Sequence, residues 1–191
     1  MRNLLILLLI FFLSCQEVEK TPLKKIVVDT NEIVNSKKTN KKELIGEKFI
    51  FHDIKTLADK KVNSEILIGK PTLIIAWSIT CKSCIEEIPI LNELVTKYSD
   101  KVNFIAITNN SKKEIRRFIR KREFNFTHII NAKEIHNDYN IYSFPKTFLL
   151  DKNGIITKTN IRGITYKKIN GKFVKRNENG EEFVRLIDKL L

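Results

Sequence analysis

Two cysteines separated by two residues are the side chains of this sequence best suited to chemistry. Cys81-Lys82-Ser83-Cys84 follows an apolar run, 72–77, and opens a segment with helical periodicity. A thiol at a helix N-terminus meets unpaired amides and the positive end of the helix dipole, which favour the nucleophilic thiolate, and Lys82 should favour it further. The spacing predicts disulfide exchange, in which Cys81 attacks a substrate disulfide and Cys84 resolves the mixed intermediate.

The flanking sequence predicts the elements that hold this pair in place. Short apolar runs predict strands, and apolar residues on one face predict helices. Ser111 and Glu114 form a capping box that opens a helix, while Asn153-Gly154 is a hairpin signal. The expected strands are 48–51, 72–77, 102–108, 126–130, 146–151 and 155–159, and the expected helices are 84–98, one that starts after Ser111, and 181–191. This order predicts an α/β domain whose mixed central sheet is covered by helices on both faces.

The first residues carry the features of an export signal. An unbroken apolar stretch, 4–13, is about half the roughly 20 residues that a membrane-spanning helix needs, so residues 1–14 are interpreted as a signal peptide. The small residue and Cys15 that close the stretch resemble the lipobox of bacterial lipoproteins, which implies a lipid on Cys15. The alternative is ordinary secretion with a spare thiol. Lipidation leaves the two remaining cysteines as one pair.

Composition divides the remaining chain into a tether and one domain. Residues 15–47 are rich in Lys, Asn, Thr and Glu without a sustained period, which predicts a flexible tether after the lipidated cysteine, and residues 48–191 form the expected domain.

The net charge of +13 makes nucleic acid a possible class of partner, but the expected location outside the cytoplasm argues against it. A basic stretch, 112–122, is interpreted as a solvated helix face, with a lipid or acidic docking surface as the alternative.

Two separated motifs resemble one family. Residues 69–84 and 86–89 resemble the TlpA/ResA-like thiol-disulfide oxidoreductases of bacterial envelopes. Residues 142–154 are similar to the cis-proline segment of that family and to the hairpin that follows it. The resemblance runs roughly from Phe49 to the C-terminus, and it implies a thioredoxin-like fold.

The resemblance also implies roles for single residues. Pro145 is expected to be cis and to lie beside the cysteines, where the backbone before it docks the substrate chain. Glu87 matches the acidic residue kept beside the thiols and is expected to move protons to or from Cys84, with a solvated helix residue as the alternative. Pro89 matches a helix-kinking proline, for which a structural role is favoured, and core packing explains Trp77 nearly as well as the family motif does.

The implied activity is dithiol–disulfide exchange outside the cytoplasm, more as a reductase than as an oxidant, with no metal or organic cofactor. Exported proteins are the implied substrates, with apocytochrome c and its paired haem cysteines as one candidate. A membrane thiol transporter would supply the electrons. The expected protein is a monomer in the cell envelope, held to a bacterial membrane by the lipid on Cys15, with its domain on the periplasmic side and no nucleic-acid partner.

Four other interpretations of the cysteine pair compete with this one. A structural disulfide would leave the placement between strand and helix unexplained. A zinc site needs about four ligands, and His52, His128 and His136 are scattered along the sequence. A copper carrier like the Sco proteins has one more residue between its cysteines. A peroxiredoxin would need a proline where Ile74 stands, ahead of a Thr-x-x-Cys.

Overall fold

The computed structural model describes residues 44–177 and 180–191 of the 191-residue chain. The chain divides into two units, 1–42 and 43–191, and all described residues belong to the second. The predicted signal peptide, Cys15 and most of the tether therefore lie outside the described residues. The folded unit includes residues before 48, because the backbone N–H of Gly46 donates to the carbonyl of Ile156 at 2.8 Å.

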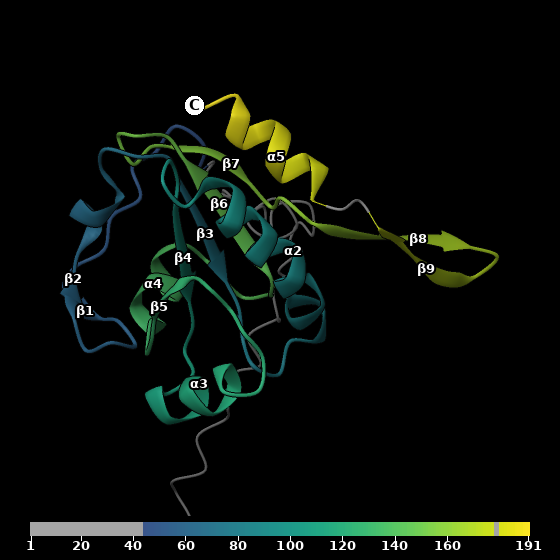
Figure 1. The fold of residues 1–191 in the computed structure, drawn as a ribbon, viewed down its shortest axis with the longest axis horizontal. Helices are drawn as coiled ribbons and strands as arrows, with labels where there is room; N and C mark the ends of the chain where they lie inside the picture. Colours follow the sequence, from purple (N-terminus) through teal and green to yellow (C-terminus); the bar gives the residue numbers. More distant parts are fainter. Residues whose placement is uncertain (1–43, 178–179) are drawn as a thin grey trace, which may run out of the picture. The chain divides into compact units, whose positions relative to one another are not determined.

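A five-stranded sheet with the order β5-β4-β3-β6-β7 forms the centre of the unit (Figure 1). The central strand β3 (Thr72–Ala76) runs parallel to β4 (Asn103–Ile107) and antiparallel to β6 (Lys146–Leu150). Beyond them, β5 (Thr127–Ile129) is parallel to β4 and β7 (Ile156–Thr159) is antiparallel to β6. The sheet is mixed, as predicted.

Helices cover both faces of this sheet. One apolar core joins it to α2 (Lys82–Tyr98), α3 (Lys112–Ile119) and α5 (Glu181–Asp188). A second core joins the opposite face to α4 (Lys133–Asp138) and the 3-10 helix η1 (Ser64–Leu67). This arrangement confirms the predicted α/β class with a thioredoxin-like fold.

The central strand shows why its sequence is apolar without a break. Leu73 and Ile75 enter the core under α2, whereas Ile74 and Ala76 enter the core under α4. Successive side chains of a strand point to opposite faces, so a strand covered on both faces needs apolar residues at every position. The strand ends immediately before Trp77, and the cysteine pair follows.

The strand expected at 48–51 is not formed. Lys48 makes an isolated β-bridge with Ile155, and the following residues pack as a loop against the α4 face. Phe49 is 1% exposed, and its ring stacks on Tyr139 with the centroids 3.9 Å apart. These residues are apolar because they fill a core, not because they extend the sheet.

Four strands were not expected from the sequence. The short pair β1 (Ile54–Lys55) and β2 (Lys61–Val62) precedes η1. A longer antiparallel pair, β8 (Ile164–Ile169) and β9 (Lys172–Asn177), lies between β7 and α5 and extends away from the main sheet (Figure 1). None of the helices among the described residues has the length and apolar character needed to cross a membrane.

Candidate active site

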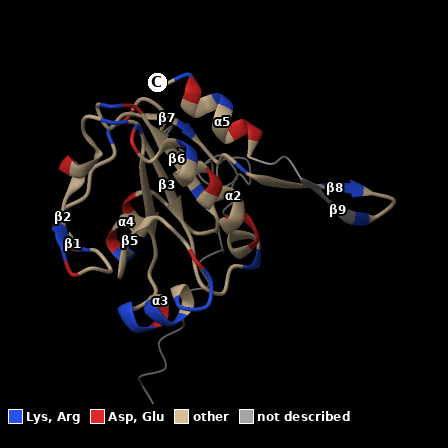
Figure 2. Ribbon diagram, in the orientation of Figure 1, with Lys and Arg blue, Asp and Glu red and all other residues tan. Residues whose placement is uncertain are grey.

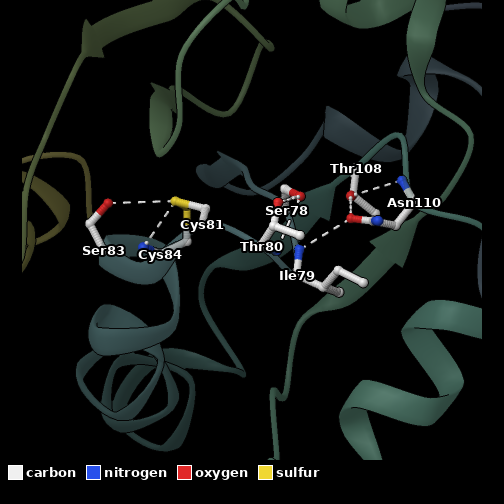
Figure 3. The surroundings of a disulfide bond; sticks show 8 residues. All are labelled: Ser78, Ile79, Thr80, Cys81, Ser83, Cys84, Thr108 and Asn110. Carbon is white, nitrogen blue, oxygen red and sulfur yellow. Dashed lines mark hydrogen bonds between the residues drawn. A yellow bond between two sulfur atoms is a disulfide. The ribbon is translucent and has the colours of Figure 1, made fainter.

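The cysteine pair is closed as a disulfide at the start of α2, with the two Cα atoms 5.3 Å apart. Cys81 is the N-cap residue of the helix, and its extended backbone lets the sulfur accept the N–H of Cys84 at 3.2 Å. Figure 3 shows this N–H and the Ser83 hydroxyl directed at the Cys81 sulfur. Donors aimed at a sulfur stabilise negative charge on it, because an N-cap atom meets otherwise unpaired amides.

The two cysteines differ in exposure. Cys84 is 1% exposed and packs in the core under α2, in the same cluster as Trp77 and Ile88. Cys81 is half-buried and contributes to the wall of a cleft. A substrate sulfur can therefore reach Cys81, whereas Cys84 is shielded from solvent.

The cleft beside Cys81 has a volume of about 630 Å³. Three segments form its wall: the first turns of α2, the loop that precedes Pro145, and β8. The lining residues are Thr80, Cys81, Lys82, Ser83, Glu86, Tyr142, Ser143, Phe144 and Tyr166. Tyr142 is 81% exposed, and the hydroxyl of Tyr166 donates to the carboxylate of Glu86. Such an open cleft can admit a polypeptide segment.

The loop between β3 and the disulfide is anchored by a residue that sequence reasoning missed. The side-chain carbonyl of Asn110 accepts the N–H of Ile79 at 3.1 Å and the hydroxyl of Thr108 at 3.0 Å (Figure 3). Asn110 lies 31 positions after Ile79 and follows β4. Because β3 and β4 are parallel, the loops after both strands meet at one edge of the sheet, and this edge carries the disulfide.

Glu87 is buried at 2% exposure beneath the start of β8, so the alternative of a solvated helix residue is wrong. Its Oε1 accepts the backbone N–H groups of Gly163 at 3.1 Å and Ile164 at 3.2 Å, and its buried Oε2 has no hydrogen-bond partner within the part of the chain that the structure describes. Burial raises the pKa of Glu87, while the Ile164 N–H, the charge of Arg162 and the Gly163 N–H oppose that rise.

A family model described as the AhpC/TSA family matches residues 45–159, more than half of the chain. The chain belongs to the AhpC/TSA family. The matched range contains the disulfide, Glu87 and Pro145, and it ends at the last residue of β7. Within this AhpC/TSA chain, the β8–β9 hairpin and α5 lie beyond the match.

Curated relatives of this AhpC/TSA chain include a thioredoxin-like protein and thiol-disulfide oxidoreductases. The thioredoxin-like protein YneN of Bacillus subtilis is 32% identical over 62% of this chain and 72% of its own length. The thiol-disulfide oxidoreductase ResA of Bacillus cereus is 30% identical over 60% of this chain and 68% of its own length. With these relatives and a Cys-x-x-Cys disulfide, the chain is a thiol-disulfide oxidoreductase.

A solved structure agrees on the fold. The thiol:disulfide interchange protein DsbE of Chlorobium tepidum superposes with a TM-score of 0.63 at 16% identity, over 77% of this chain and 98% of that protein. At this identity the likeness concerns the thioredoxin-like architecture alone.

The sequence also singled out Pro145, Pro89 and Trp77. The peptide bond between Phe144 and Pro145 is cis, as the resemblance implied, and Pro145 is buried directly after the cleft-lining Phe144. Pro89 lies inside α2 and is exposed. Trp77 is buried and packs edge-on against Phe118 and Phe124, which gives it a core role.

Lys82, which was expected to favour the thiolate from its position between the cysteines, is exposed to solvent. Its side chain is 91% exposed, and its Nζ lies 4.0 Å from Glu86. The expected support of the thiolate by Lys82 is therefore weakened by a neighbouring carboxylate and by water.

The three histidines differ in exposure. His52 is exposed, whereas His128 and His136 are buried. Burial lowers the pKa of both buried imidazoles. In residues 44–177 and 180–191, no three Cys, His, Asp or Glu side chains gather as a metal site would require.

Proposed function

We propose that this protein is an envelope thiol-disulfide reductase, in which Cys81 is the nucleophile and Cys84 the resolving thiol. The observation that carries the proposal is the unequal exposure of the two sulfurs, one in the wall of the cleft and one in the core. A nucleophile must be reached by the substrate, and a resolving thiol must be protected from it until the mixed disulfide has formed.

The reaction follows from this geometry. The Cys81 thiolate attacks one sulfur of a substrate disulfide, the substrate S–S bond breaks, and one substrate thiolate leaves. The Cys84 thiolate then attacks the Cys81 sulfur, which restores the intramolecular disulfide and releases the second substrate thiolate. Two electrons pass to the substrate, and both released thiolates take up protons. A dithiol donor returns two electrons to the pair by the same exchange.

Two further residues support these steps. Glu87 is proposed to pass a proton to or from Cys84, because residues three apart share a helix face and the buried Oε2 is unpartnered within the described part of the chain. Pro145 is proposed to present the backbone before it to the substrate chain, since Ser143 and Phe144 line the cleft beside Cys81.

The envelope location rests on the N-terminal sequence. The apolar stretch and Cys15 favour export and lipidation, with residues 15–47 as a tether and the domain on the periplasmic side of a bacterial membrane. The proposed direction of electron flow, toward the substrate, rests on the resemblance of residues 69–84 and 142–154 to the TlpA/ResA-like family. A membrane thiol transporter is the proposed electron donor, and exported proteins with paired cysteines, such as apocytochrome c, are the proposed substrates.

The reduction potential of the pair tests the proposal. The full chain is equilibrated with glutathione and dithiothreitol buffers, and Cys84→Ser is the control that cannot form the disulfide. A value near roughly −270 mV supports a reductase, whereas a value near roughly −120 mV supports an oxidant or isomerase. A disulfide that no thiol buffer reduces would be structural. Peroxide consumption that survives Cys84→Ser would show a peroxidase instead.

A further inference from the structure

The β8–β9 hairpin is the part of the fold that the site chemistry leaves unexplained. It follows the matched range of residues 45–159 and precedes α5. Asn170 and Gly171 form its turn, both with positive φ, as a tight hairpin turn requires. Its ladder continues from Ile164 to Ile169 on one strand, paired with residues 177 to 172 on the other.

The start of this hairpin is held against α2. Ile164 is buried, and its backbone N–H donates to the Glu87 carboxylate. Two residues later, the hydroxyl of Tyr166 donates to Glu86, the adjacent residue of the same helix. Two consecutive carboxylates of α2 therefore fix the first residues of β8 beside the helix that carries the disulfide.

Tyr166 links the hairpin to the cleft. Its side chain lines the same cleft as Cys81 and Phe144. Side chains two apart in a strand share a face, so the exposed Lys168 continues the surface that begins with Tyr166. A polypeptide that lies in the cleft and extends past Tyr166 meets this basic surface next.

The hairpin carries positive charge alone. Residues 164–177 contain five basic residues and no Asp or Glu: Lys167, Lys168, Lys172, Lys175 and Arg176. Figure 2 shows basic positions on both of its strands. The side chains of Lys167, Lys168 and Lys172 are exposed, and the salt bridges between described side chains join Lys82 to Glu86 and Lys112 to Asp59, so neither one neutralises these three lysines.

We propose that the β8–β9 hairpin is a docking arm for acidic polypeptide segments that flank the target cysteines of a substrate protein. The inference rests on the proposed function, because the docked chain is the substrate of Cys81. A surface whose charges are all of one sign, beside a cleft, raises the local concentration of partners of opposite charge. The hairpin also exposes apolar side chains next to its lysines, among them Tyr166 and Ile169, which suits contact with a polypeptide.

Charged disulfide peptides test the docking arm. Three peptides share one cyclic Cys-x-x-Cys disulfide and carry acidic, neutral or basic flanks, and their reduction by the full chain in neutral detergent is followed as kcat/KM. The wild-type protein should prefer the acidic peptide, and added salt should weaken the preference. Lys167→Glu/Lys168→Glu should lower the ratio of acidic to basic kcat/KM by roughly tenfold or more at low ionic strength.

The matched control makes the same change of charge on a different surface of the protein. Lys101 precedes β4 and Lys152 follows β6, at the end of the sheet where Thr72 pairs, opposite to the disulfide. Lys101→Glu/Lys152→Glu changes the net charge equally and should keep the wild-type ratio. Each peptide has its own intrinsic reactivity, but this cancels when one ratio is divided by another. An equal drop in the control variant would overturn the docking arm and indicate an effect of net charge.

The outcomes separate the docking arm from the proposed function. An acidic-to-basic ratio that Lys167→Glu/Lys168→Glu leaves unchanged would leave the oxidoreductase intact and remove the docking arm, whereas no exchange with any peptide would remove the proposed function itself. A lipid partner is tested by sedimentation of the same full-chain variants with phosphatidylglycerol and phosphatidylcholine vesicles. If Lys167→Glu/Lys168→Glu lowers binding to phosphatidylglycerol vesicles and keeps the peptide ratio, the hairpin faces lipid and the proposal is wrong.

Discussion

The Glu87 carboxylate accepts the backbone N–H of Gly163 at 3.1 Å, across 76 positions of sequence. This contact joins the helix that carries the disulfide to the segment that opens the β8–β9 hairpin. A buried carboxylate with one unpartnered oxygen in the described part of the chain is costly to ionise, and burial accordingly raises its pKa. The same group therefore fixes the hairpin and makes the fold sensitive to pH.

Glu87→Gln should change the pH dependence of stability. The pKa of Glu87 in the folded protein lies above its ordinary value of 4.5. Between pH 4.5 and that higher value, the folded state therefore holds a proton that the unfolded state has lost. The contribution to stability is full below pH 4.5 and is lost as the pH rises through the folded value. The substituted amide cannot ionise and keeps an oxygen for the two N–H donors, so the variant should gain stability relative to wild type as the pH rises.

Urea unfolding of the oxidised proteins at several pH values measures this difference. Glu93→Gln is the matched control, because Glu93 is an exposed carboxylate on the same helix. The control should follow the wild-type pH dependence. A constant difference between Glu87→Gln and wild type across the range would mean that Glu87 is ionised equally easily in the folded and unfolded states, contrary to its burial.

Leu91→Ala should destabilise the fold without touching the disulfide. Leu91 is fully buried on the face of α2 that meets the sheet, and removal of a buried leucine side chain costs about 2–5 kcal/mol of unfolding free energy through lost burial and the cavity that remains. Glu93→Ala, on the exposed face of α2, should cost less than about 0.5 kcal/mol. Denaturant unfolding compares the two, and similar losses would contradict the packing of α2.

Most of the central sheet and its long helices could be predicted from the sequence. The strand expected at 72–77 is β3, and the helix expected at 84–98 is α2 with two more residues at its start. Their signals are local: an unbroken apolar run for a strand buried on both faces, and one-sided apolar spacing for a helix. Tertiary packing agrees with these local preferences, so the elements form where the pattern places them.

The missed elements had weaker or different signals. Residues 166–169 of β8 are all exposed, so burial imposes no alternation there, but Asn170-Gly171 is the same turn signal that was recognised at Asn153-Gly154. The helix α4 has only six residues, and its N-cap Ala132 makes no side-chain capping bond. Short helices without a cap are set by packing, which sequence periodicity does not report.

The disulfide was predicted in full because both cysteines lie within one turn. The remaining walls of the site depend on contacts between distant segments, such as Tyr166 with Glu86, 80 positions apart, and Asn110 with Ile79. No local pattern encodes such pairs. The burial of Glu87 was missed for the same reason, since the segment that covers it lies beyond the family motifs.

Ser111→Ala should lower stability modestly and leave disulfide exchange intact. The Ser111 hydroxyl accepts the N–H of Glu114, and the Glu114 carboxylate accepts the N–H of Ser111 at 2.8 Å, so the capping box satisfies donors at both positions. Its loss costs about 1 kcal/mol of unfolding free energy. Ser99→Ala, at the exposed C-cap of α2, is the control and should cost less. Equal values would mean that the cap does not stabilise α3.

Alkylation of the reduced protein should distinguish the two cysteines. Cys81 lines the cleft and its sulfur faces helix N-terminal donors, whereas Cys84 is 1% exposed, so iodoacetamide should modify Cys81 faster by roughly tenfold or more. Cys84→Ser should react like the wild-type Cys81 and accumulate a mixed disulfide with a substrate peptide, because the resolving thiol is absent.

Cys81→Ser supplies the opposite control. The remaining thiol of the pair, Cys84, should react slowly in the native protein and at the ordinary rate in denaturant, where burial is lost. Mass spectrometry of the modified peptides reports which sulfur carries the label. If Cys84 reacted first in the native protein, the roles of the two cysteines would be reversed, and the cleft lined by Tyr142, Phe144 and Tyr166 would not be the entry for the substrate.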